Sequence, residues 1–522
     1  MSSQLEVSRV KFQGAKEGPA KRSGSVFRAA GAGDAVAVVW GWLQAVRALQ
    51  LATCNLPRCL AVAGGVFLSA CTSFPTTEKE VAASEPQAPQ LAIQSWQTEQ
   101  GAKVMFVPSD ALPMLDIRLV MAAGSSRDAP LPGVASLTSA LIGEGARGLS
   151  VDAIARGFED RGASFSTSSY RDMGIVSLRT LSDPAYRDPV LALFNRVIGS
   201  PTFPQDALDR LRTRAMQGLR MEQQVPGPQV NKAFMATLYG GHPYGQPSEG
   251  SLDSLPQIQR QQLQSFFETY YAAGNTVIAM VGDVTRDEAE QMAAQISAAL
   301  PAGPAAPVLP RADALHARVR EHIDFPSAQT HILLGNQATW RGNPDHVALY
   351  VGNQILGGGG FASILTDEVR QKRGYVYGIG SGFSAMASGG PFQVQFKTAN
   401  ENADEALTLT LDLIRDFVET GPTEAQLAQA RANILGSFAL STANNSDIIG
   451  QLGAIGFYDL PLDYLQDFNR QVRAVTVDDI RAAFQRTLDT ENLAIVSIGP
   501  QPPQLVADGK DKTEAEGQVH GN

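Results

Sequence analysis

The sequence predicts an α+β protein with two homologous halves, in which each half packs helices on a mainly antiparallel sheet. Three observations lead to this fold class. Strand-like and helix-like segments alternate along most of the chain from residue 91 onward. Four segments of the first half reappear in the second half at an offset of about 215 to 220 residues, which indicates an internal repeat. A proline-rich stretch at residues 301–314 separates the two halves.

Chain length and composition indicate a large globular protein. At 522 residues the chain exceeds the size at which a single hydrophobic core stops growing, so two or more domains are expected. Hydrophobic residues make up 44% of the chain and charged residues 18%, which suits a globular protein. A net charge of −10 with no basic block argues against nucleic acid as a general partner.

The first 71 residues read as a leader that ends in a bacterial lipobox. Residues 60–70 form an apolar run that is too short to span a bilayer but has the length of the hydrophobic region of a signal peptide. The run ends in the sequence LSAC, so Cys71 is the expected lipidated first residue of the mature protein. The alternative is a buried helix that happens to end in cysteine. The lipobox is favoured because the polar, Pro- and Ser-rich residues 72–90 follow at once, as a flexible linker would.

The lipobox also predicts where the protein resides. A lipidated Cys71 followed by Thr72, which offers no acidic retention signal, favours an outer-membrane-anchored lipoprotein facing the periplasm of a Gram-negative bacterium. The other two cysteines, Cys54 and Cys59, also precede the globular part, which therefore contains no thiol. Residues 1–45 are too long for the charged start of a signal peptide, so either translation begins near residue 46 or the leader is unusual.

The first globular domain is expected over residues 91–300. Alternating apolar positions predict strands, and apolar positions at three- and four-residue spacing predict helices. The expected strands are residues 104–108, 114–122, 165–169, 174–180 and 275–282, and the expected helices are residues 134–142, 151–161, 189–198, 204–223 and 262–271.

The second globular domain is expected over residues 321–500. It follows an interdomain linker at residues 301–320 and precedes a tail at residues 501–522 that is expected to be disordered. The segments that start at residues 330, 390, 421 and 492 correspond to those that start at residues 115, 174, 202 and 275. The second domain should therefore have the same α+β layers as the first.

The most informative stretch of the second domain is residues 355–383. It contains four consecutive glycines, Gly357, Gly358, Gly359 and Gly360. Without side chains, this run can bring its backbone close to another chain or to a ligand. Residues 361–372 then predict a short helix with its C-cap at Gly374, and a strand follows. Arg370 and Tyr377 flank this turn, so both could point to one side of a shared loop.

Over about residues 91–499 the chain resembles the pitrilysin and mitochondrial processing peptidase family of zinc peptidases. The resemblance implies a clam-shell arrangement of the two halves. In active members of the family, the first helix of the first half carries the motif H-x-x-E-H, which supplies two zinc ligands and the general base, and a glutamate about 75 residues later completes the site.

The positions that match this metal motif hold other residue types here. They are Ser136, Ser139 and Ala140, with the later glutamate position near Gln217. Hydroxyl, methyl and amide groups bind Zn²⁺ poorly and cannot replace the general base. The six histidines of the chain include no pair three or four residues apart. We therefore expect no metal and no other cofactor in this chain.

A second signature of the family, R-x-x-x-G-x-x-Y, is present as Arg370, Gly374 and Tyr377, after the family's glycine-rich run. The resemblance implies that this Arg and Tyr reach the substrate at the zinc, and that the glycine run helps to bind it. A guanidinium and a phenol can hydrogen-bond a peptide carbonyl and the oxyanion of a tetrahedral intermediate. Without the resemblance, Arg370 would be interpreted as a cation at a helix end and Tyr377 as a half-buried strand aromatic.

Other motifs carry less weight. The His-Pro-Tyr turn at residues 242–244 resembles a family landmark with a structural role. The G-x-G-x-G pattern at residues 378–382 is not followed by a helix start, so a strand with small residues is expected there rather than a phosphate site. The sequence contains no G-x-S-x-G elbow and no Walker A motif.

A chain with the Arg/Tyr half of this site but without the metal half is predicted to be the non-catalytic subunit of a heterodimeric zinc metallopeptidase. The expected partner is a homologous H-x-x-E-H subunit that holds the zinc, while Arg370 and Tyr377 act in trans on short or unfolded peptides. The alternative is a catalytically silent protein of peptide binding or assembly, which would hold extended peptides by strand addition. An active homodimer would require zinc in this chain.

Overall fold

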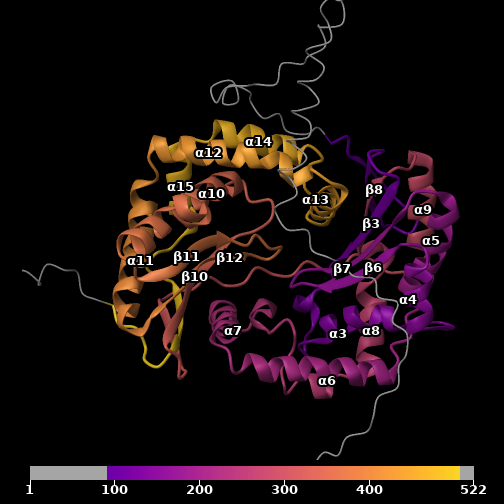
Figure 1. Ribbon diagram of the computed structural model, residues 1–522, viewed down its shortest axis with the longest axis horizontal. Helices are drawn as coiled ribbons and strands as arrows, with labels where there is room; N and C mark the ends of the chain where they lie inside the picture. The colour runs from indigo at the N-terminus through magenta and orange to yellow at the C-terminus, as the bar shows by residue number, and fades with distance from the viewer. Residues whose placement is uncertain (1–90, 506–522) are drawn as a thin grey trace, which may run out of the picture. The chain divides into compact units, whose positions relative to one another are not determined.

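Two β-sheets, one from each half of the chain, form the framework of the protein (Figure 1). The computed structural model describes residues 91–505. The leader, the lipobox at Cys71, the linker at residues 72–90 and most of the predicted tail lie outside these residues.

The first sheet has six strands in the order β1-β2-β8-β3-β7-β6. The strands are β1 (Gln94–Gln97), β2 (Lys103–Pro108), β3 (Met114–Met121), β6 (Ser164–Ser169), β7 (Gly174–Leu181) and β8 (Thr276–Gly282). Neighbouring strands are antiparallel except for β2 and β8, which are parallel.

The second sheet has five strands in the order β11-β12-β10-β13-β9. The strands are β9 (Val319–Asp324), β10 (Gln329–Thr339), β11 (Val376–Phe383), β12 (Gly390–Ala399) and β13 (Ala494–Gly499). Only β9 and β13 pair in parallel. Apart from the additional edge strand β1, the two sheets have the same strand order, and each pairs its first and last strands in parallel. The predicted α+β fold with two domains built on mainly antiparallel sheets is confirmed.

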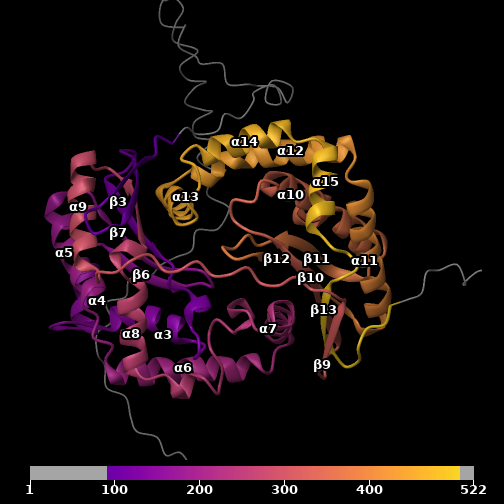
Figure 2. The ribbon, with the colours of Figure 1, turned by 180° about the vertical axis from the view of Figure 1, so that it is seen from behind.

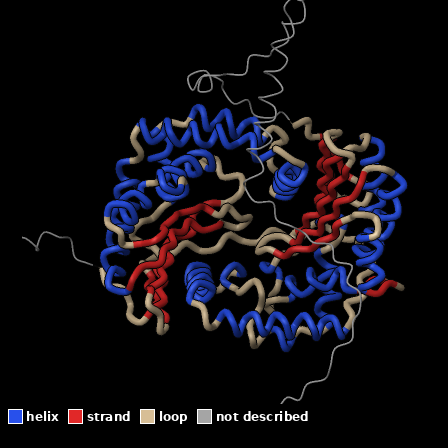
Figure 3. The backbone as a smooth tube through the Cα atoms, in the orientation of Figure 1, coloured by secondary structure: helices blue, strands red, loops and turns tan. Residues whose placement is uncertain are grey.

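Helices cover both faces of each sheet (Figure 3). Those of the first half are α3 (Val134–Leu141), α4 (Val151–Glu159), α5 (Pro184–Gly199), α6 (Gln205–Glu222), α7 (Pro226–Tyr239), α8 (Arg260–Tyr270) and α9 (Arg286–Ala299). Those of the second half are α10 (His346–Asn353), α11 (Ala403–Thr420), α12 (Glu424–Phe438), α13 (Asn445–Phe457), α14 (Tyr464–Ala474) and α15 (Val477–Thr487). None of the helices within residues 91–505 combines the length and the apolar character that a bilayer-spanning helix needs.

Each half contributes one helix to the sheet of the other half. α13 shares a hydrophobic cluster with β2, β3 and β8, whereas α7 shares one with β10 and β13. Figures 1 and 2 both show α13 beside the first sheet and α7 beside the second. Glycines on α13 allow the close approach, because a Cβ on Gly456 would stand only 2.5 Å from Cγ1 of Val277. This exchange of helices connects the cores of the two halves.

The connection between the halves, residues 300–318, contains no regular element and is held by hydrogen bonds from both sides. From the first half, Arg127 Nη2 donates to the carbonyl of Pro307 at 2.7 Å. From the second half, Gln337 Nε2 donates to the carbonyl of Asp313 at 2.7 Å, and Ser388 Oγ to that of Leu309 at 3.2 Å.

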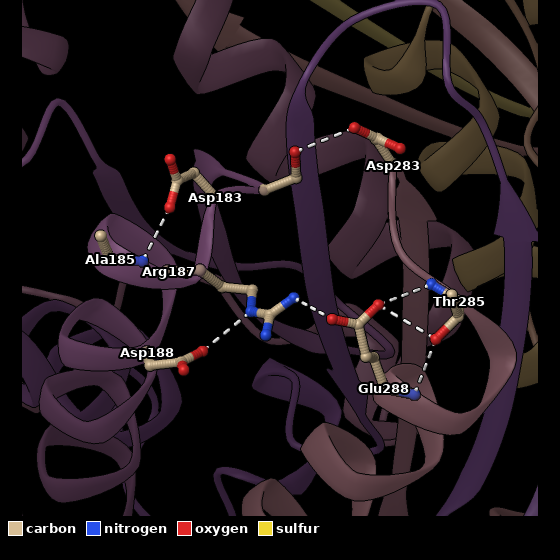
Figure 4. Close-up of polar contacts among 8 residues, drawn as sticks. Asp183, Ala185, Arg187, Asp188, Asp283, Thr285 and Glu288 are labelled. Atoms are coloured by element: carbon tan, nitrogen blue, oxygen red, sulfur yellow. Dashed lines mark hydrogen bonds and ion pairs between the residues drawn. The ribbon is translucent and has the colours of Figure 1, made fainter.

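The starts of α5 and α9 are tied together by polar contacts (Figure 4). The Arg187 guanidinium donates to Glu288 at 2.8 Å and to Asp188 at 2.9 Å. Glu288 also accepts the backbone amide of Thr285 at 2.9 Å and completes the capping box of α9. The Thr285 amide and the Arg187 guanidinium both lower the pKa of Glu288.

Four helices differ from the expectations. α5 begins at Pro184 rather than at residue 189, because Asp183 accepts the amide of Ala185 at 2.9 Å and caps the helix earlier than the apolar spacing indicates. α7 and α9 lie in stretches for which no element was predicted. The helix expected over residues 361–372 begins at residue 364, and residues 360–362 form a separate 3₁₀ turn.

Candidate functional site

Arg370 and Tyr377, which the sequence places on two sides of a turn, lie side by side in the structure. The guanidinium carbon of Arg370 is 5.2 Å from the ring centroid of Tyr377 and 4.7 Å from that of Phe361. The two aromatic side chains are strongly exposed, Tyr377 at 79% and Phe361 at 70%. These three residues, called the Arg370 cluster below, present a cation between two aromatic rings to solvent.

The backbone around the Arg370 cluster explains its geometry. Arg370 lies in the π-helical winding of residues 366–372, which ends where the Gly374 amide donates to the Arg370 carbonyl at 3.0 Å. Gly374 takes a φ of +66°, as expected of the predicted C-cap glycine. The chain then enters the edge strand β11, where the pairing with β12 shifts by one residue between Val376 and Gly378. Tyr377 is the residue at this irregularity, and such a bulge redirects a side chain.

Phe361 is the member of the cluster that the sequence analysis missed. Its position depends on the 3₁₀ turn at residues 360–362. Gln371 Nε2 donates to the Phe361 carbonyl at 3.0 Å and holds this turn against the following helix. The only signal in the sequence is an aromatic residue directly after the glycine run.

The Arg370 guanidinium keeps its hydrogen-bonding capacity. Within residues 91–505, no carboxylate forms an ion pair with Arg370, although two acids lie in the same helix. Both of them, Asp367 and Glu368, contact Lys372 instead, at 2.9 Å and 2.6 Å. A guanidinium without an ion-pair partner can donate hydrogen bonds to a carbonyl oxygen or an oxyanion, and so can the hydroxyl of the neighbouring Tyr377.

The glycine run approaches other segments of its own chain. A Cβ on Gly357 would stand 2.4 Å from Ser381 Oγ of β11, and one on Gly358 would stand 2.5 Å from the Asn353 side-chain amide. A Cβ on Gly359 would stand 2.4 Å from the carbonyl of Gln354. These contacts explain three glycines by internal packing, whereas the close approach was expected to be to a partner chain or a ligand. Gly360 instead has a φ of +60°.

The four positions that match the metal motif do not form a metal site. Ser136 donates its hydroxyl hydrogen to Glu249 at 3.0 Å, and Ser139 is buried within α3 with an exposure of 3%. Ala140 on α3 and Gln217 on α6 are both exposed. Residues 91–505 contain no group of three or more His, Cys, Asp or Glu residues placed to hold a metal ion. A hydroxyl engaged with a carboxylate, a buried hydroxyl, a methyl and an amide do not fit Zn²⁺.

The acids near α3 serve its N-terminus. Asp128 accepts the backbone amides of Gly133 at 2.6 Å and of Ala135 at 2.7 Å. Burial raises the pKa of Asp128 to about 7, and the charge of Glu249 adds to the shift. Asp128 caps the helix, and Glu249 binds Ser136 of the same helix.

The turn at residues 242–244 is part of a buried network around Asp172. Asp172 Oδ1 accepts the hydroxyl of the fully buried Tyr244, and Oδ2 accepts the backbone amide of Ala387 at 2.9 Å. The Tyr458 hydroxyl donates to Asp172 Oδ2 at 3.3 Å, and the Ser388 amide donates to the Tyr244 hydroxyl at 3.0 Å. Asp172 therefore joins the first half to two segments of the second half. The sequence analysis did not single it out.

Comparison with known families covers both halves. Residues 105–251 match the family model described as insulinase, peptidase family M16, and residues 257–434 match the model described as peptidase M16 inactive domain. The chain is similar to the crystal structure of a peptidase M16 inactive domain from Pseudomonas fluorescens, with 46% sequence identity and a TM-score of 0.77. That match covers 80% of this chain and 100% of the other.

Curated relatives have names of two kinds. The non-peptidase homolog YmxG of Helicobacter pylori is 22% identical over 401 residues, which cover 76% of this chain and 91% of that protein. An uncharacterized zinc protease of Mycobacterium tuberculosis is 28% identical over 298 residues, which cover 56% of this chain and 68% of that protein.

Proposed function

This chain belongs to peptidase family M16, and we propose that it is the non-catalytic subunit of a heterodimeric zinc metallopeptidase. A similar solved structure is described as an M16 inactive domain, and a curated relative as a non-peptidase homolog. The proposed partner is a homologous subunit with the H-x-x-E-H motif, which would hold the zinc and the general base. The proposed substrates are short or unfolded peptides.

The observation that carries this proposal is the half-buried Arg370, which has no ion-pair partner within residues 91–505, beside the exposed Tyr377. Arg370 would donate hydrogen bonds to the carbonyl oxygen of the bound peptide, and the Tyr377 hydroxyl would donate to the same oxygen as negative charge develops on it. Phe361 would hold the guanidinium in place through its ring face. Gly357 to Gly360 would set the position of this loop against β11 and so shape the substrate-binding surface.

The test is peptide cleavage by the chain mixed with its H-x-x-E-H partner, co-purified from the native host. Arg370→Ala and Tyr377→Phe should each lower kcat/KM by about 10²-fold, as expected for the loss of an oxyanion donor. Arg373→Ala is the matched control, because this arginine is exposed one turn away and outside the cluster. Unchanged cleavage in both variants, or an equal loss in the control, would contradict the proposal.

A second candidate is a catalytically silent peptide-binding or assembly protein. It is favoured by β6, an edge strand that pairs only with β7 among the strands of residues 91–505. An extended peptide could add to its free edge through backbone hydrogen bonds. Peptide binding by the isolated chain, in a host without a neighbouring H-x-x-E-H gene, would favour this candidate.

We also propose that a lipid on Cys71 anchors the protein in the outer membrane. The globular part of the protein then faces the periplasm. Membrane fractionation of cells that produce Cys71→Ala tests this location. The variant should move from the membrane to the soluble fraction, and its persistence in the membrane would count against the anchor.

A further inference from the structure

A cavity of about 430 Å³ is lined by Gly378, the residue that follows Tyr377 of the Arg370 cluster. Its walls come from the first turns of α7 and from β10, β11 and β12 of the second sheet. The residues that decide its chemistry are Asn231 of α7, His331 of β10, Gly378 and Gly380 of β11, and Gln395 and Lys397 of β12. Gly378 follows Tyr377 in the chain, so a peptide held at Tyr377 would lie next to this cavity.

Two glycines form one wall of the cavity, and the fold itself does not require the first of them. Gly378 pairs with Lys397 across the strands, and Gly380 pairs with Gln395. A Cβ on Gly378 would meet no atom within 4 Å, and this residue does not have the positive φ that favours glycine. Its missing side chain therefore leaves space that the protein does not fill. Gly357 is different, since internal atoms crowd it.

The charge of the cavity is positive. Lys397 is exposed, and no carboxylate within residues 91–505 forms an ion pair with it. None of the described residues that line the cavity is acidic. His331 faces Lys397 directly across the strands, and burial together with the Lys397 charge lowers the pKa of His331, so the imidazole is neutral at neutral pH. One cation and neutral hydrogen-bonding groups thus surround an open space.

We propose that this cavity binds a carboxylate of the peptide whose backbone contacts Arg370 and Tyr377. The Lys397 ammonium donates to the carboxylate, and the Gln395 amide supplies a second donor on the same face of β12. The space left by Gly378 admits the carboxylate-bearing group. The carboxylate is either the C-terminus of the peptide or an Asp or Glu side chain. This inference rests on the proposed function for the position of the peptide, but peptide binding to this chain alone can test it.

The experiment measures binding of fluorescent peptides to the purified chain by anisotropy. One peptide series compares a free C-terminus with an amidated one, and a second compares internal Glu with Gln. The carboxylate forms should bind about tenfold more tightly, as expected for a charge-assisted hydrogen bond. Whichever series shows this preference identifies the source of the carboxylate. Equal binding of all four peptides, or no binding at all, would overturn the proposal.

Variants then locate the binding group. Lys397→Met should remove the preference for the carboxylate and leave the affinity for the amidated or Gln peptides unchanged. Gly378→Val should weaken binding by filling the cavity. Gly382→Val is the matched control, because a Cβ there also meets no atom within 4 Å and Gly382 does not line the cavity. Equal weakening by the two valines, or a Lys397→Met variant that weakens all peptides alike, would overturn the assignment.

The two proposals can fail separately. Cleavage with the partner subunit reports on the heterodimer, whereas peptide binding by the isolated chain reports on the cavity. If the carboxylate preference is present but no partner activates cleavage, the cavity assignment stands and the heterodimer proposal falls. If Arg370→Ala abolishes cleavage but substrates with and without the carboxylate bind equally, the cavity assignment falls.

Discussion

The two halves of the molecule differ in how they hold the residues at the family's active-site positions. The first half carries the metal positions, and the second half carries the Arg/Tyr pair. On α3 of the first half, the two polar residues at the metal positions serve the fold, because Ser139 is buried and Ser136 is hydrogen-bonded to Glu249. In the second half, Tyr377 is exposed and Arg370 is half-buried, and the side chains of both have no polar partner within residues 91–505. A buried polar side chain normally has an internal partner, whereas a solvent-accessible one without a partner stays free to bind a ligand. Under the proposed function, the second half therefore supplies the ligand-binding part of the family's active site.

The largest effect that sharpens this comparison is expected on α3. Ser139→Glu restores the residue type of active relatives, but at a position that is 3% exposed and next to the fully buried Tyr271. An unpaired buried carboxylate should lower the free energy of unfolding by about 3 kcal/mol. Urea denaturation of the purified chain measures this loss.

Ala140→Glu is the matched control for Ser139→Glu, because the neighbouring Ala140 is exposed. Its effect on the free energy of unfolding should stay within about 0.5 kcal/mol. Equal stability of the two variants would mean that α3 still accommodates a glutamate at the general-base position. The conclusion that the first half has lost its part of the active site would then be wrong.

A smaller effect is expected from Asp128, which caps the same helix. The pKa of Asp128 is about 7 in the folded protein and about 3.9 in the unfolded chain. Between these two pH values, the Asp128 carboxyl is protonated in the folded protein and ionised in the unfolded chain. The stability from this group is therefore fully present below about pH 4 and is lost as the pH rises through about 7. Between pH 5 and pH 8, the wild-type free energy of unfolding should fall by on the order of 2 kcal/mol more than that of Asp128→Asn.

Thermal or urea unfolding across this pH range measures the difference. Asp110→Asn is the control, since Asp110 is exposed and should leave the wild-type pH dependence unchanged. If Asp128→Asn and wild type had parallel pH profiles, Asp128 would be ionised throughout, and its role as a buried cap would need revision.

The sequence was sufficient to predict features that depend on residues close together in the chain. Arg370 and Tyr377 could be paired in advance because a single glycine C-cap, Gly374, determines the reversal between them. The positions on α3 could be assigned because the resemblance to the zinc peptidase family matches its H-x-x-E-H motif to this helix. α7 was missed because Pro226 and Pro228 suggest a loop, although both lie in the first turn, where a missing amide hydrogen costs nothing.

Contacts between distant segments could not be predicted. Asp172 was not singled out from the sequence, because its partners Tyr244, Ala387 and Tyr458 come from three separate parts of the chain. The cavity beside Tyr377 was also hidden, because it forms where a helix of the first half meets the sheet of the second. Only the packing of the two halves brings these groups together.

The smallest and most specific effect is expected at Phe361, the unpredicted member of the Arg370 cluster. Because its ring is 70% exposed, Phe361→Ala should change the free energy of unfolding by less than about 0.5 kcal/mol. The variant should still lower kcat/KM with the partner subunit by about two- to fivefold, since the lost cation–π contact of about 0.5 to 1 kcal/mol orients Arg370. Phe361→Tyr should retain the wild-type rate, because it keeps the aromatic ring. Leu440→Ala, which removes a side chain of equal exposure (69%) outside the cluster, should leave the rate unchanged. A rate loss in Leu440→Ala equal to that in Phe361→Ala would show that exposed apolar residues act through nonspecific contacts with the substrate or the partner subunit. The role of Phe361 in orienting Arg370 would then be wrong.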